Sequence, residues 1–245
     1  MKPDFSKLNA LYAARPAEDL LTDAAASVFG PRAALVSSFG AESVVLLDMA
    51  AQIDRAFPVL FIDTEMLFAE TIQYQLDLID RLGLTNVIRI RPEARETAWE
   101  DPVGDLSARD QDACCNLRKV RPLARALAGY DVSITGRKRH QANTRSTLDL
   151  VESDQGRIKI NPLANWTRED IRARMAERAL PSHPLVARGY PSIGCAPCTT
   201  PVAEGEDPRA GRWRGAEKTE CGIHFIGGKL VRPGAAAPNS EGATS

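Results

Sequence analysis

The chain has 245 residues, of which 31 are Lys or Arg and 32 are Asp or Glu, so its formal net charge at pH 7 is −1. At about 150 residues per domain this length predicts one large domain or two small ones, and a hydrophobic fraction of 44% excludes wholesale disorder. The near-neutral total excludes the overall basic field of a general nucleic-acid or membrane-surface binder.

Predicted strands and helices alternate through the first 135 residues. Strands that alternate with helices at this spacing predict an α/β fold in which a parallel sheet carries helices on both faces. The predicted helices are Asp19–Phe29, Val44–Ala51, Met66–Leu82 and Leu117–Leu127, and the predicted strands are Ala33–Val36, Phe57–Ile62, Asn86–Ile90 and Asp131–Thr135.

The pattern changes after Gly136. A basic loop over residues 137–140 is followed by a possible strand over Arg157–Ile160 and by a short helix that Thr167 is expected to cap. From Pro181 the chain is rich in Pro, Gly and Arg. We expect a domain over residues 1–198, a C-terminal segment over residues 199–232 and a disordered tail over residues 233–245.

Two polar turns follow predicted strands of this sheet. Ser37–Ser43 joins a strand to a helix, and its small residues would let backbone N–H groups and the helix N-terminus approach an anion. It is neither a Walker loop nor a dinucleotide fingerprint. Asp63 and Thr64 end the next strand at the same edge of the sheet, where open α/β folds bind ligands. The first turn alone could be either a nucleotide-binding site or a tight turn that binds no ligand. The presence of a second polar turn at the same edge favours the nucleotide site.

The five cysteines are at positions 114, 115, 195, 198 and 221. The N-terminus lacks the apolar core of a signal peptide, and no apolar run nears the about 20 residues of a membrane helix, so we expect a cytoplasmic protein with reduced thiols. Adjacent cysteines rarely bridge each other. Two cysteine pairs suit a tetrahedral zinc or a cubane iron–sulfur cluster, and consecutive ligands favour the cluster. The alternative is a redox Cys-x-x-Cys with two unrelated buried cysteines.

Cys221 lies in the motif Lys-Thr-Glu-Cys-Gly-Ile-His, which spans residues 218–224. Lys218 and His224 would each favour the thiolate, which is the nucleophilic form of cysteine. Arg209 and Arg212 precede the motif and offer guanidinium groups suited to phosphate or sulfate, although such loops are commonly only solvated.

These motifs resemble those of the assimilatory adenylyl-sulfate reductases of bacteria and plants. The resemblance rests on Cys-Cys with a following Arg-Lys-Val, on Gly-Cys-x-x-Cys and on the heptad around Cys221, and it extends from Ser37 to His224. It also includes Ser-Ser-Phe-Gly-Ala-Glu-Ser at 37–43 and Thr-Gly-Arg-Lys at 135–138. The resemblance implies a Rossmann-like adenine nucleotide alpha hydrolase fold and the branch that carries an iron–sulfur cluster.

The resemblance also implies roles for individual residues. Cys221 would attack the sulfur of adenosine 5′-phosphosulfate, and thioredoxin would then release sulfite from the resulting S-sulfocysteine. Lys119 and His224 would lie at the phosphosulfate. One [4Fe-4S] cluster per chain would be held by Cys114, Cys115, Cys195 and Cys198, and the substrate would be bound by Ser37, Ser38, Phe39, Gly40, Ser43, Asp63, Thr64, Arg145, Arg209 and Arg212.

Several alternatives stay open at this point. The substrate could be the 3′-phosphorylated analogue, or both compounds, since the basic loop at Arg137–Arg139 could accept a 3′-phosphate. The fold also resembles adenylating ATP pyrophosphatases and sulfate adenylyltransferase small subunits, which do not need Cys221. A zinc- or cluster-based redox sensor would use four cysteines without a nucleophile. A homo-oligomer is possible. We expect neither nucleic acid nor membrane as a partner.

Cys221 must meet the substrate in one step and a protein reductant in the next. We therefore expect the segment from about Pro201 to Arg232, which has few apolar anchors, to close over bound nucleotide and to open afterwards. A fixed cleft is the alternative.

Overall fold

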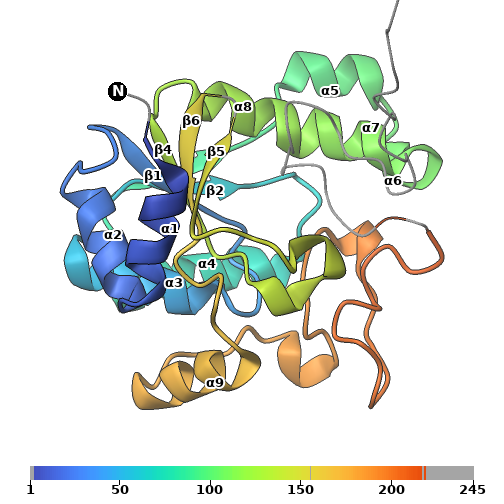
Figure 1. Ribbon diagram of the computed structural model, residues 1–245. Coiled ribbons are helices and arrows are strands. Elements are labelled where there is room, and N and C mark those ends of the chain that lie inside the picture. The colour runs from blue at the N-terminus through green and yellow to red at the C-terminus, as the bar shows by residue number, and fades with distance from the viewer. Residues whose placement is uncertain (1–2, 155, 217, 219–245) are drawn as a thin grey trace, which may run out of the picture.

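A computed structural model describes residues 3–154, 156–216 and 218 of the chain (Figure 1). Its centre is a sheet in which six strands of the described residues lie in the order β3-β2-β1-β4-β6-β5. The strands are β1 (Ala33–Ser37), β2 (Val59–Ile62), β3 (Val87–Ile90), β4 (Val132–Thr135), β5 (Val151–Asp154) and β6 (Arg157–Ile160).

The inner strands β2 and β4 are buried on both faces, which is the pattern of a parallel sheet covered by helices. β1 pairs in parallel with β2, where Leu35 lies opposite Val59, and with β4, where Leu35 lies opposite Ile134. The prediction of a parallel sheet is thus confirmed for five strands. β5 was not predicted, and it pairs antiparallel with β6 at the edge. β5 has the polar sequence Val-Glu-Ser-Asp, which carries no apolar run for a sequence pattern to detect.

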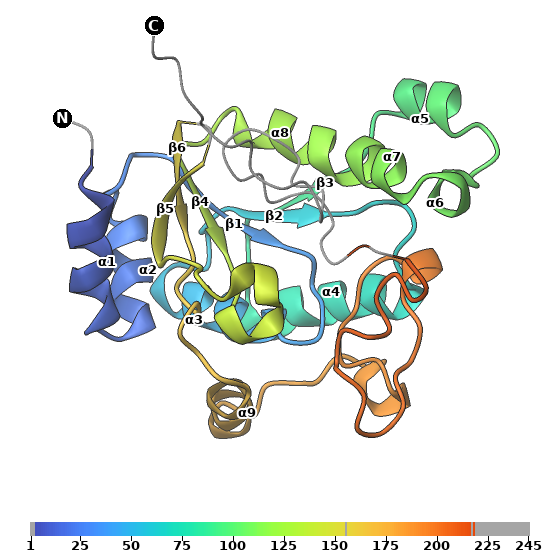
Figure 2. The ribbon, with the colours of Figure 1, turned by 45° about the vertical axis from the view of Figure 1, so that its right-hand side comes forward.

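Helices cover both faces of the sheet, as predicted (Figure 2). α3 (Ser43–Ile53) and α4 (Ala69–Leu82) pack on one face with α2 (Ala17–Ala25), and they share its larger core. α8 (Arg121–Leu127) packs on the other face, where Leu123 and Leu127 contact β2 and β3 residues. The remaining α-helices of the described residues are α1 (Phe5–Ala13), α5 (Ala94–Glu100), α6 (Leu106–Arg109), α7 (Gln111–Cys115) and α9 (Arg168–Glu177).

Some helix bounds differ from those predicted. α1, α5, α6 and α7 were not predicted, and α2 begins and ends earlier than the predicted helix. α4 begins at Ala69 rather than Met66 because Leu67 pairs with Cys195 in an antiparallel bridge. The expected cap of α9 is confirmed, since the hydroxyl of Thr167 accepts a hydrogen bond from the amide of Asp170.

One continuous helical run crosses the region of the first cysteine pair. α7 ends at Cys115, a single π-helical stretch η1 (Asn116–Val120) follows, and α8 continues from Arg121. π-Helical turns inside α-helices frequently occur at functional sites, because they redirect side chains on one face. Here the π-helical stretch contains Arg118 and Lys119, and both side chains are buried.

Residues 178–216 form loops and short 3₁₀ turns, including η4 (Val186–Arg188) and η5 (Ala196–Cys198). Residues 199–216 fold back on the second cysteine pair: the amide of Thr200 donates to the carbonyl of Gly211, and the amide of Trp213 donates to that of Cys198. The Trp213 ring is buried, so this segment has an apolar anchor that the sequence analysis did not foresee. No helix of the described residues is long and apolar enough to cross a membrane.

His183 fastens this loop region to α4. Its side chain is buried, its ring packs on Tyr74, and its Nδ1 accepts from the amide of Leu185, so Nε2 donates to the hydroxyl of Thr71 at 3.0 Å. Burial lowers the pKa of His183 from 6.5 to about 4.

We expect this histidine to make the fold sensitive to mild acid. The unfolded chain binds the proton of His183 more readily than the folded chain does. The free energy of unfolding is therefore highest above the unfolded pKa and decreases as the pH falls from 6.5 to about 4. The expected loss is about 3 kcal/mol. Urea unfolding across this pH range measures it. His183→Gln keeps a hydrogen-bonding side chain and should flatten this part of the profile, and an unchanged profile in His183→Gln would contradict the assignment.

Candidate functional site

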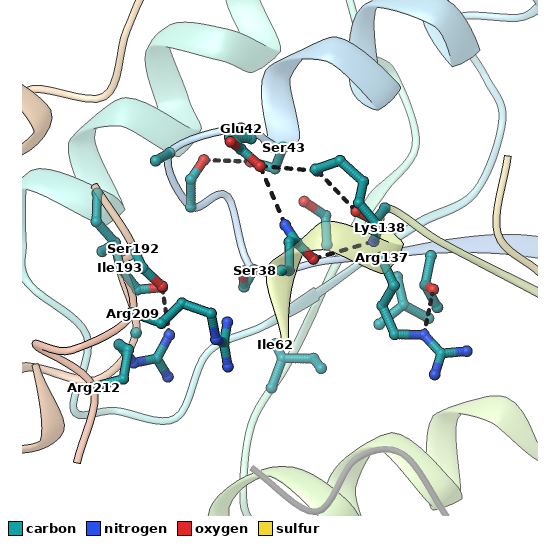
Figure 3. A pocket seen from close by; sticks show the side chains of 18 of the residues that line it. Ser38, Glu42, Ser43, Ile62, Arg137, Lys138, Ser192, Ile193, Arg209 and Arg212 are labelled. Atoms are coloured by element: carbon teal, nitrogen blue, oxygen red, sulfur yellow. Dashed lines mark hydrogen bonds and ion pairs between the residues drawn. The ribbon is translucent and has the colours of Figure 1, made fainter. Parts of the chain in front are cut away.

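A cavity of about 260 Å³ opens where β1, β2 and β4 end (Figure 3). Ser37, Ile62 and Thr135, which are the last residues of these strands, all line it. This is the carboxyl edge of the parallel strands, where open α/β sheets bind ligands. The polar turn after β1 and the loop after β4 form two of its walls, and residues 191–195 with Arg209 and Arg212 form another.

Most of the residues predicted to bind substrate line this cavity. The turn after β1 is held by its own serines: the amide of Phe39 donates to the hydroxyl of Ser37, and the hydroxyl of Ser43 donates to the carbonyl of Gly40 at 2.7 Å. Residues of three segments far apart in the sequence line this one cavity. The predicted residues that line it are Ser37, Ser38, Gly40, Ser43, Thr64, Lys119, Arg145, Arg209 and Arg212.

Two predicted substrate residues, Phe39 and Asp63, do not line the cavity. The Phe39 side chain is fully buried and stacks edge-on against Phe61, with its backbone at a positive φ of 49°. Asp63 pairs with Arg89 at 2.8 Å and Arg91 at 2.9 Å. Burial raises the pKa of Asp63, but these guanidinium groups and a backbone amide outweigh it and hold the pKa below its usual range. Asp63 thus fixes the strand end rather than facing the cavity.

The four predicted metal cysteines come together beside the cavity. Cys114 and Cys115 end α7, Cys195 precedes η5 and Cys198 ends it, and all four are buried free thiols. Burial, together with the charges that Cys115 and Cys195 would carry as thiolates, raises the pKa of Cys114 to about 11. The donor set is therefore all sulfur. Within the described residues, no three His, Cys, Asp or Glu side chains converge as ligands of a single ion.

Lys119 joins the cysteines to the cavity. Its buried side chain lines the cavity, and its Nζ lies 3.9 Å from the Sγ of Cys115, one helical turn earlier. A lysine ammonium is a compact charge that can attract an anion in the cavity and sulfur on the other side at once. Sequence resemblance implied this position, and the contact to Cys115 fits it.

Arg212 and Trp213 close the cavity next to the second cysteine pair. The guanidinium of Arg212 donates to the carbonyl of Ile193 at 3.2 Å and stacks 4.5 Å from the centre of the Trp213 ring. Gly194 makes room for it, because a Cβ on Gly194 would overlap the guanidinium of Arg212.

Sequence reasoning missed a polar group at the other end of the cavity. Lys138 is buried and pairs with Glu42 at 3.0 Å, and Gln141 donates to the same carboxylate. The three residues line the cavity, and Arg145 donates to Gln141 at 2.6 Å. The only signal was the Thr-Gly-Arg-Lys motif, since nothing in the sequence links Glu42 to a lysine 96 positions later.

Cys221 and His224, two of the three residues predicted to be catalytic, lie outside the described residues. Lys218, the first residue of their motif, is described. Its Nζ donates to the carbonyl of Gln111 at 3.1 Å and pairs with Asp112. The motif therefore begins beside α7, the helix that carries the first cysteine pair.

Comparison with known proteins identifies the family to which the chain is similar. Residues 32–201 match the family model of the phosphoadenosine phosphosulfate reductase domain. A relative from Mesorhizobium japonicum named adenosine 5′-phosphosulfate reductase is 50% identical over 220 residues, covering 90% of this chain and 87% of the relative. A relative from Gloeobacter violaceus named phosphoadenosine 5′-phosphosulfate reductase is 41% identical, covering 87% and 92%. The crystal structure of a phosphoadenylyl-sulfate reductase from Candida auris has a TM-score of 0.69 and 27% identity, covering 80% and 97%.

Proposed function

The chain belongs to the phosphoadenosine phosphosulfate reductase family, and we propose that it reduces adenosine 5′-phosphosulfate to sulfite and AMP in sulfate assimilation, with thioredoxin as the reductant. The observation that carries this proposal is Lys119, which faces the cavity and lies against a cysteine pair. A cation at the phosphosulfate suits an enzyme that moves a sulfonyl group, because negative charge develops on the leaving phosphate oxygen as the S–O bond breaks.

The proposed cofactor is one [4Fe-4S] cluster held by Cys114, Cys115, Cys195 and Cys198. Five buried side-chain N–H groups of the described residues have no hydrogen-bond partner, at Arg118, Arg121, Arg174, Arg212 and Trp213. Three of them support the fit, because the charges of Arg118 and Arg212 act on Cys114 and Cys198 and the amide of Trp213 donates to the carbonyl of Cys198. Sulfur atoms would give such donors acceptors. When bound, the cluster would supply an electrostatic field beside Lys119 rather than electrons.

The chemistry proposed for the protein needs one nucleophile. The thiolate of Cys221 attacks the sulfate sulfur, an S–S bond forms, and the S–O bond breaks as its electron pair leaves with AMP. A thioredoxin thiolate then attacks Sγ of Cys221, and sulfite leaves with the electrons of that S–S bond. The second thioredoxin thiol resolves the mixed disulfide and restores Cys221, so thioredoxin supplies both electrons. His224 is proposed to lie near the phosphosulfate.

The arginines of the cavity are proposed to hold the phosphosulfate. Arg209 and Arg212 line the wall next to the cysteines, and Arg145 approaches from the loop after β4. Guanidinium forks match the geometry of phosphate and sulfate oxygens. The turn at Ser37–Ser43 is proposed to line the adenosine.

Substituting Gly194 tests the arginine assignment. In Gly194→Ala the new methyl group displaces the Arg212 guanidinium, so we expect the Kd for AMP and the KM for substrate to rise about tenfold while the fold persists. Isothermal titration with AMP measures the first quantity. Gly129→Ala is the matched control, because a Cβ there meets only ordinary contact. Equal AMP affinity in both variants would mean that Arg212 does not hold the ligand.

The preference for the unphosphorylated substrate has support from the basic loop. Arg137 pairs with Glu152, Lys138 with Glu42, and the Nε of Arg139 donates to the carbonyl of Leu148. All three cations of the loop thus have acceptors within the chain, and a 3′-phosphate would have to compete for them. The name of the Gloeobacter relative supports the second candidate, which is reduction of 3′-phosphoadenosine 5′-phosphosulfate or of both compounds. Comparable kcat/KM values for the two compounds would establish dual use.

The experiment that tests the proposed function uses protein purified without oxygen. Iron and sulfide analysis should give close to four irons per chain, and the protein with thioredoxin should release sulfite and AMP in equal amounts. Zinc in place of iron, or no sulfite, would refute the proposal. We propose that the reaction takes place in the cytoplasm, where thiols stay reduced.

The proposed closure of the segment at residues 201–232 is a separate expectation. Limited proteolysis with trypsin should cut this segment rapidly in the free enzyme and more slowly with AMP bound, because ordering around ligand protects backbone from cleavage. The described part of this segment, residues 201–216, already makes backbone hydrogen bonds to neighbouring loops. The digest without AMP measures the protection that these bonds give, and the digest with AMP measures the protection that is added. Equal protection with and without AMP would favour a fixed cleft.

A further inference from the structure

The turn after β2 contacts the loop that carries the second cysteine pair. The Thr64 hydroxyl lies 3.1 Å from the Sγ of Cys195, and the amide of Ala196 donates to the carbonyl of Met66 at 2.8 Å. Leu67 bridges to Cys195 in antiparallel fashion. The position of Cys195 therefore follows the position of this turn.

The same turn is joined to the helix that carries the first cysteine pair, through Arg118. One guanidinium nitrogen of Arg118 donates to the carbonyl of Thr64 at 3.2 Å, and another donates to the carboxylate of Asp101 at 2.7 Å. The Arg118 side chain is 6% exposed and that of Asp101 is 0% exposed. Arg118 stands four residues after Cys114, so the two lie on one face of the helical run.

The geometry of this contact suits arginine and not lysine. Arg118 meets a carbonyl and a carboxylate at once, and a planar fork fixes the angle between those two bonds. Asp101 is itself held by the amide of Leu106 at 2.9 Å. Burial raises the pKa of Asp101, but the Arg118 guanidinium and this amide outweigh it and keep the carboxylate charged. The start of α6 thus holds Asp101 in place, and Asp101 in turn holds the guanidinium of Arg118.

We propose that Arg118 is a positioning residue that sets the distance between the two cysteine pairs. Arg118 holds Thr64, and Thr64 holds Cys195, so the fork fixes α7 and its Cys114–Cys115 pair against the loop of Cys195. The inference rests on the proposed function in one respect, because a cluster shared by four cysteines is what needs this spacing. It assigns Arg118 no contact with substrate.

The alternative is that the buried Arg118–Asp101 ion pair only stabilises the fold. The properties of the cluster distinguish this alternative from a positioning role. A loss of fold support lowers the temperature of unfolding. A shift of one cysteine pair against the other changes the visible absorption and Mössbauer spectra of the cluster and the rate at which a chelator removes its iron. The test therefore reads the cluster in folded protein rather than turnover alone.

The test uses the anaerobic holoprotein with Arg118→Lys and Asp101→Asn. Arg118→Lys keeps the charge and loses the fork, and Asp101→Asn keeps the shape and loses the ion pair. Arg121→Lys is the matched control, because Arg121 lies on the same helical run and pairs with the partly exposed Glu100. Near-ultraviolet circular dichroism verifies that each protein is folded, and iron release to a ferrous chelator is followed with time.

We expect both variants to release iron about tenfold faster than the wild type and the Arg121→Lys control, with altered Mössbauer parameters. Unchanged iron release and unchanged spectra in folded Arg118→Lys and Asp101→Asn would overturn the proposal. Wild-type protein without iron would instead refute the cluster, so the two failures are distinguishable.

Discussion

Cys221→Ser should abolish sulfite formation, lowering kcat at least about a thousandfold, because a serine hydroxyl is a far weaker nucleophile than a thiolate and cannot form the S–S bond. The variant should keep its iron and its AMP affinity, since none of the residues that line the described cavity is changed. A steady-state assay with thioredoxin in excess measures the loss.

The pattern of the three readouts separates this nucleophile from a residue needed for folding. Iron content and AMP binding are determined on the same Cys221→Ser sample as turnover, so a misfolded variant would lose all three. A variant that still released sulfite at a tenth of the wild-type rate would exclude Cys221 as the nucleophile. If the protein were instead an adenylyltransferase or a redox sensor with this fold, its activity would not depend on Cys221 and Cys221→Ser would retain it.

The second large effect is expected at Lys119. Lys119→Ala removes the cation between the cavity and Cys115, and we expect kcat to fall about a hundredfold with iron content unchanged, as for the loss of one preorganised group that stabilises developing charge. Rate measurements at saturating substrate give kcat, and colorimetric iron analysis gives the cluster.

A matched control is available for Lys119. Lys159 is also a buried lysine, but it pairs with Asp154 and does not line the cavity, so Lys159→Ala tests the cost of removing a buried lysine as such. An equal loss of turnover in both variants would mean that Lys119 has no specific role at the substrate. Iron lost together with activity in Lys119→Ala would assign Lys119 to cluster retention instead.

The sequence predicted the centre of the fold well because local signals and burial agree there. β1 and β2 are short runs of mostly apolar residues, and β4 alternates Val132 and Ile134 with Ser133 and Thr135; all three are buried inner strands that end in polar turns. α1 and β5 were missed for the opposite reason. α1 shows only weak amphipathic periodicity, and β5 is polar and exists through pairing with β6 at the edge. Pairing at an edge is a tertiary effect that no local pattern contains.

The candidate site divides in the same way. The four cysteines and the turn at residues 37–43 were found because their residue types carry the chemistry. Asp63 and Phe39 stand in the right segments, but Asp63 pairs with Arg89, and Phe39, in a turn with positive φ, packs against Phe61 in the core. The Glu42–Lys138 pair depends on contacts across the sheet. Position in a motif thus predicts the segment of a site better than it predicts which side chain faces the ligand.

One measurement tests the central claim most directly: the mass of the anaerobic protein after a single exposure to adenosine 5′-phosphosulfate with no thioredoxin present. The account predicts that one SO₃ group is added per chain, that peptide mapping places it on Cys221, that an equal amount of AMP is released, and that thioredoxin then removes the group as sulfite. An unmodified protein, or a group on any cysteine other than Cys221, would contradict the account.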